Sequence, residues 1–91
     1  MSDAAANLVE RRKRLIYRST YTGMKETDLL LGAFARAHLA DFDTGQLERY
    51  EALLAGAPDA QIFAWAIGRD PVPLAFDTDV MTLLKNFKIG L

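Results

Sequence analysis

The sequence predicts an all-α fold, a small five-helix bundle, from three observations. Apolar side chains recur at helical spacing in each segment, and no stretch alternates apolar and polar residues long enough to demand a strand. The 91 residues are 51% hydrophobic and 25% charged, a composition typical of one globular domain. Gly23, Gly56, Gly68 and the three prolines fall between the apolar runs, where short loops join helices. We therefore expect one helical domain over residues 1–91, with residues 1–7 as a frayed tail.

The first two helices are expected over residues 7–19 and from residue 24 or 25 to residue 39. Gly23 follows a run of poor helix formers and is a natural turn residue between them. The second helix has a broad apolar surface, which predicts a central position with several neighbours. We place Leu30, Phe34 and Ala37 on its inward face, and Leu29, Leu31 and Ala33 widen that face.

The third helix has the clearest start signal in the chain. Asp43 is an N-cap candidate with Gln46 three residues later, the pattern of a capping box, and Phe42 and Leu47 have the spacing of a hydrophobic staple. We expect this helix to end near Ala55, before Gly56.

The fourth and fifth helices are expected over residues 58–67 and from residue 74 or 77 to residue 87. Pro58 suits the first position of a helix, and Gly68 ends that helix. Pro71 and Pro73 predict an extended connection before the fifth helix, in which Asp77 is the expected cap.

The composition limits the chemistry that the chain can support. It has no cysteine and one histidine, His38, which excludes disulfides, thiolate sites and histidine metal clusters. No apolar run approaches the length of a transmembrane helix, so we expect no membrane insertion. A domain of this size buries only about 60–65% of its unfolded surface, so a deep pocket would remove much of its core. We therefore expect no enzyme, no catalytic residue and no metal site.

Charge is unevenly distributed along the chain. Residues 1–40 hold seven basic and four acidic residues, a net charge of +3, and residues 41–91 have a net charge of −4. The run at residues 11–14 is the densest basic segment, which suits either a solvated helix face or contact with phosphate or an acidic protein surface. Acidic pairs at residues 41/43 and 77/79 are explained more simply by capping than by metal binding.

Residues 22–26 are the least ordinary segment, because a glycine joins two helices and a carboxylate follows in the next turn. A plain helix–turn–helix corner would explain both features. The segment also resembles the Arg-Gly-x-x-Glu motif of the succinate dehydrogenase assembly factors of the SdhE type, with Gly23 and Glu26 in frame and Thr22 in the place of the arginine. The likeness continues over residues 14–17, 26–31, 34–35, 47–54, 62–65 and 80–84.

The resemblance implies a non-enzymatic assembly factor or chaperone. Such a factor binds the flavoprotein subunit of succinate dehydrogenase or fumarate reductase and promotes covalent attachment of FAD there. It holds no cofactor stably itself, binds no nucleic acid, and is expected to be a monomer when free. The implied partner-binding residues are Thr22, Gly23, Met24 and Glu26, with Arg14, Tyr17 and Arg18 beside them.

Two further expectations complete the sequence-based account. Asp3, Glu10 and the short leader argue against a transit peptide, so we expect the bacterial cytoplasm rather than the mitochondrial matrix. The alternative function is a small helical nucleic-acid-binding or regulatory module that uses the basic first helix.

Overall fold

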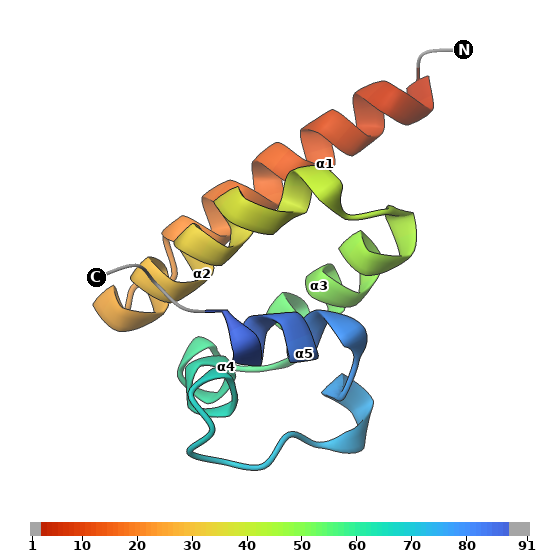
Figure 1. The fold of residues 1–91 in the computed structure, drawn as a ribbon. Helices are drawn as coiled ribbons and strands as arrows, with labels where there is room; N and C mark the ends of the chain where they lie inside the picture. The colour runs from red at the N-terminus through yellow and green to blue at the C-terminus, as the bar shows by residue number, and fades with distance from the viewer. Residues whose placement is uncertain (1–2, 88–91) are drawn as a thin grey trace.

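The computed structural model describes residues 3–87, and it confirms the all-α prediction. This part of the chain contains helices and no strand (Figure 1). The α-helices are α1 (Asp3–Thr20), α2 (Lys25–His38), α3 (Thr44–Gly56), α4 (Asp59–Ala66) and α5 (Asp79–Asn86), with the short 3-10 helices η1 (Leu39–Asp41) and η2 (Leu74–Phe76).

The two longest helices, α1 and α2, lie side by side and run antiparallel, and α3, α4 and α5 gather on one side of this pair (Figure 1). The first helix begins at Asp3, so residues 3–7, expected as a frayed tail, are helical, and residues 1–2 lie outside the described part. The corner between α1 and α2 is thus at the opposite end of α1 from the N-terminus.

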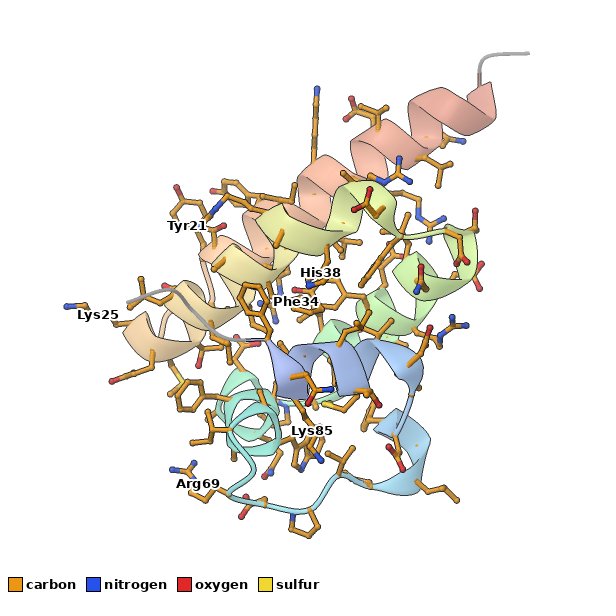
Figure 2. The ribbon with its side chains drawn as sticks, in the orientation of Figure 1. Tyr21, Lys25, Phe34, His38, Arg69 and Lys85 are labelled. Carbon is orange, nitrogen blue, oxygen red and sulfur yellow. The ribbon has the colours of Figure 1, made fainter. Side chains whose placement is uncertain are left out.

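One ring occupies the centre of the bundle. Phe34 of α2 is fully buried. Its ring centroid lies 5.7 Å from that of Tyr50 on α3 and 5.6 Å from that of Phe87, directly after α5. The rings of Phe42 and His38 lie 6.1 and 4.8 Å away. Figure 2 labels Phe34 and His38. The core therefore closes around a single side chain that three other segments contact.

The inward face of α2 is rotated from the predicted one. Its buried residues are Thr27, Leu30, Leu31, Gly32, Phe34 and Ala35. Apart from Gly32, these follow the spacing i, i+3, i+4, i+7, i+8, which defines one stripe of a helix. Leu29 and Ala37, expected inside, lie outside that stripe and are exposed. The prediction failed at these positions because the stretch is apolar on nearly every side.

Helix caps explain the start of α3 and α5. The capping box of Asp43 and Gln46 is present, as predicted. At α5 the cap is Thr78, whose hydroxyl accepts from the N–H of Met81, and the expected cap Asp77 lies one residue too early. Pro58 precedes α4 as an extended N-cap residue rather than as its first helical residue.

A buried hydroxyl pair joins α1 to α3. The Ser19 hydroxyl donates to the Leu15 carbonyl at 2.6 Å and lies 2.5 Å from the Tyr50 hydroxyl. Because a serine hydroxyl has one hydrogen, Tyr50 is the donor in the second bond. Burial raises the pKa of Tyr50 to about 12.

Three arginines of α1 also hold the helix to the rest of the bundle. Arg12 donates to the carbonyls of Leu39 and Phe42 at 2.8 and 2.9 Å, and so fixes the connection after α2. Arg11 pairs with Glu51 of α3, and Arg18 pairs with Asp59 of α4. The guanidinium groups of these three arginines are therefore bound to other parts of the same domain.

Arg12 and Arg14 are expected to differ sharply in their effect on stability. Arg12→Ala removes two hydrogen bonds from a charged donor and leaves two carbonyls without it, so it should lower the free energy of unfolding by about 2 kcal/mol. Arg14 is exposed, and Arg14→Ala should change that free energy by less than about 0.5 kcal/mol. Urea unfolding measures both, and equal losses would contradict the assigned roles.

Stability should fall at alkaline pH because of Tyr50. The ordinary tyrosine pKa of 10.0 rises to about 12 in the fold, so the folded state binds the proton more tightly than the unfolded state does. The stability that Tyr50 adds is fully present below pH 10 and is lost as the pH rises toward 12. Tyr50→Phe should lower the free energy of unfolding by about 1 kcal/mol near neutral pH. As the pH rises, that free energy should then fall less steeply than in the parent chain. Urea unfolding at a series of pH values tests this, and parallel declines would contradict it.

Candidate functional site

The chain turns between α1 and α2 through residues 21–24, which we call the corner. Gly23 has φ +93°, in the left-handed region that residues with a side chain rarely adopt. No atom lies within 4 Å of the position that a Cβ of Gly23 would occupy. The glycine is therefore required by the backbone conformation, and the space beside it is open to a partner.

Thr22 turns toward α2 rather than outward. Its backbone N–H and its hydroxyl both donate to one oxygen, Oδ1 of Asp28, each at 2.5 Å. The N–H of Met24 donates to the Thr22 hydroxyl oxygen at 3.3 Å. Thr22 was predicted as a partner-binding residue, and the structure places its side chain in contacts within the chain.

The same contacts act on the acidity of Asp28. The hydrogen bond from the Thr22 hydroxyl, followed by that from the Thr22 N–H, lowers the pKa of the carboxyl. Partial burial works in the opposite direction, and a further hydrogen bond from the Gly23 N–H adds to the lowering. Sequence patterns do not reveal this contact, because Thr22 and Asp28 are six residues apart across a turn whose geometry is not visible in the sequence.

Met24 and Glu26 face solvent at the start of α2. Met24 is the N-cap residue, in an extended conformation with no side-chain cap, and its side chain is partly exposed. Glu26 is exposed, and within the described part of the chain its carboxylate has no hydrogen bond or ion pair. Gly23, Met24 and Glu26 thus come together as an accessible group.

An aromatic pair extends this group along α1. The rings of Tyr17 and Tyr21 lie 4.6 Å apart, and both side chains are about two-thirds exposed. Tyr17 was among the predicted site residues, whereas Tyr21 was not, although its spacing of four from Tyr17 was the available signal. Figure 2 shows Tyr21 and Lys25 on the same side of the molecule.

Arg14 and Arg18, both predicted at the site, have different surroundings. Arg14 is exposed one turn before Tyr17. Arg18 donates from Nη2 to Asp59 Oδ1 at 2.8 Å and to the Leu54 carbonyl at 3.4 Å, so it is engaged with α3 and α4. The structure therefore separates Arg18 from the exposed group at the corner.

The basic run of α1 does not form a continuous cationic surface. Arg11 and Arg12 are bound to Glu51 and to backbone carbonyls, and only Lys13 and Arg14 are fully exposed. Because nucleic-acid affinity grows with the number of phosphates neutralised, this arrangement weakens the alternative that the sequence left open.

Other candidate sites have structural roles in the part of the chain that the structure describes. Asp79 is held by Arg49 at 2.7 Å, and Asp43 caps α3. No cluster of three metal-binding side chains occurs among the described residues. A hollow of about 50 Å³ between α3 and η2 is far smaller than a ligand pocket of about 300 Å³ or more. The described helices are each too short or too polar to cross a membrane.

The Asp28 carboxyl should report on the hydroxyl of Thr22. Thr22→Val removes the largest cause of the lowered pKa, so the pKa of Asp28 should rise toward its ordinary value. A carboxyl whose pKa is lowered by folding adds stability above the unfolded-state pKa of about 3.9 and loses it as the pH falls further. The variant should therefore lose less stability on acidification. NMR titration of the side-chain carboxyl measures the change, and an unmoved pKa would show that the hydroxyl does not bind Asp28.

Comparison with known proteins gives the chain a family. Residues 13–88 match a family model described as Sdh5, flavinator of succinate dehydrogenase. The chain is 46% identical over 80 residues to succinate dehydrogenase assembly factor 2-B, mitochondrial, of Drosophila melanogaster, covering 87% of this chain and 51% of that protein. It is 44% identical to assembly factor 2-A of Drosophila mojavensis, with the same coverage. It thus spans about half the length of the curated relatives that it matches.

These relatives contradict the location expected from the sequence. We expected the bacterial cytoplasm, and the relatives named above are mitochondrial proteins, which points to mitochondria instead. The prediction was wrong because it rested on the acidic residues and brevity of the N-terminal segment, which carry little information about compartment. The resemblance noted from the motif is confirmed, since the matched region includes the corner and each helix from α2 to α5. The chain belongs to the Sdh5 family, the flavinators of succinate dehydrogenase.

Proposed function

We propose that this chain acts as a monomeric succinate dehydrogenase assembly factor that binds the flavoprotein subunit and promotes covalent attachment of FAD to it. The observation that carries the proposal is the accessible group of Gly23, Met24 and Glu26 in a chain that matches the flavinator family over residues 13–88. The flavoprotein subunit of fumarate reductase is a second partner with the same chemistry.

The corner offers chemistry for binding a protein surface. Gly23 has open space beside its backbone, so a partner's main chain can approach closely. Glu26 presents a carboxylate that is free to accept hydrogen bonds from the partner. Met24 adds a flexible apolar contact at the same place. Tyr17 and Tyr21 add aromatic surface on the adjoining turn of α1.

The proposed mode of action is selection of a partner conformation, without catalysis by this chain. In this proposal the covalent attachment of FAD takes place within the flavoprotein. A factor that binds the reactive conformation more tightly than other conformations raises its population, by tenfold for each 1.4 kcal/mol of difference in binding free energy, about the value of RT ln 10. A surface without a ligand pocket is sufficient for that task, and FAD stays with the partner.

Co-expression with the flavoprotein subunit tests the proposal. In-gel fluorescence of covalently bound flavin should be several-fold stronger when this chain is present than when it is absent. Equal fluorescence with and without the chain would contradict the proposal.

Glu26→Ala should lower the fluorescence toward the level without the factor. Its effect on stability should stay below about 1 kcal/mol, the usual value of one charge at a helix N-terminus. Glu48→Ala removes an equally exposed carboxylate from α3 and serves as the matched control, with full fluorescence expected. Loss of fluorescence that follows loss of stability in both variants would instead indicate a purely structural role for Glu26.

A further inference from the structure

We propose that Thr22 and Asp28 form a positioning pair, which fixes the corner in its binding shape while Gly23, Met24 and Glu26 make the contact with the partner. The inference rests on the proposed function, because it names the residues that determine how well the same site binds. It reassigns Thr22 from a contact residue to one that acts through its neighbours.

The geometry of the pair closes a small loop at the start of α2. Two donors of Thr22 converge on one oxygen of a residue six positions later. The Thr22 oxygen in turn accepts from the Met24 N–H. These hydrogen bonds therefore join residue 22 to residue 28 and also to Met24.

The corner has little else to hold it. Gly23 is exposed, has no atom within 4 Å of its Cβ position, and belongs to the residue type with the greatest backbone freedom. Met24 has no side-chain cap, and Glu26 has no partner among the described residues. The side chains shown to bind the backbone of residues 22–24 are those of Thr22 and its partner Asp28.

Fixing the corner before binding has a direct effect on affinity. A flexible segment loses conformational freedom when it binds, and that loss weakens the complex. A segment that is already held in the bound shape avoids most of the loss. The contribution of Thr22 should therefore depend on Asp28 and should disappear when Asp28 is absent, whereas a direct contact would contribute independently of Asp28.

The first measurement uses the free chain of 91 residues and does not involve a partner. Amide hydrogen exchange at Met24 should be several-fold faster in Thr22→Val, which keeps the shape of the side chain and removes its hydroxyl. Thr22→Ser keeps the hydroxyl and should restore slow exchange. Thr82→Val is the matched control, since it removes an exposed threonine hydroxyl that donates to the carbonyl of Thr78, the N-cap residue of α5. Unchanged exchange in Thr22→Val would overturn the proposal.

The second measurement is the affinity for the purified flavoprotein subunit of succinate dehydrogenase. Thr22→Val should raise Kd by about fivefold to tenfold, the scale of the net contribution of one ordinary hydrogen bond. Thr22→Ser and Thr82→Val should stay within about twofold of the parent, and the thermal midpoint should be similar in all. Unchanged affinity together with faster exchange would overturn the positioning role.

A double-mutant cycle separates positioning from contact. Asp28→Ala should weaken binding, and adding Thr22→Val to it should cause little further loss, since the pair is already broken. Additive losses would overturn the proposal and assign Thr22 to the interface. If the parent chain itself does not bind the flavoprotein, the proposed function fails, and the exchange result still decides whether the pair holds the corner.

Discussion

The bundle depends on the enclosure of one aromatic ring, that of Phe34. Tyr50 and Phe87 reach it from α3 and from the end of α5, and Phe42 reaches it from the connection after α2. Each of these segments must be correctly placed for the ring to be fully covered. A domain of this size buries little apolar surface beyond what its stability needs. Packing around this ring therefore fixes the position of α2 against its neighbours. The position of the corner follows, because the corner lies at the start of α2.

The arginines of α1 show why charge along a sequence is a poor guide to charge on a surface. By sequence the first 40 residues are basic and the rest are acidic. In the fold, Arg11 and Arg18 each pair with a carboxylate from the acidic part, which reduces the imbalance on both sides. Arg12 binds carbonyls and fastens the end of α2. The separation of charge is thus largely a means of holding two parts of one domain together.

Sequence patterns predicted the features that depend on neighbours along the chain. The five helices, the capping box of Asp43 and the turn at Gly23 all follow from local spacing and residue preference. Features that depend on distant partners were not accessible in the same way. The exposure of Leu29, the engagement of Arg18 with Asp59 and the inward turn of Thr22 each require knowledge of which surfaces meet. The candidate site stays a prediction from the motif, and the orientation of its members needed the structure.

Gly23 has a consequence for how the corner responds to sequence change. Because the space around it is open, an added side chain would meet no obstacle, and only the handedness of the backbone opposes it. A substitution would therefore leave the packed core intact and alter the direction in which the chain leaves α1 for α2. The backbone conformation at Gly23 opposes any side chain because of its handedness, and the open space sets no limit on side-chain size. Two substitutions of very different side-chain volume should therefore disturb the corner to a similar degree.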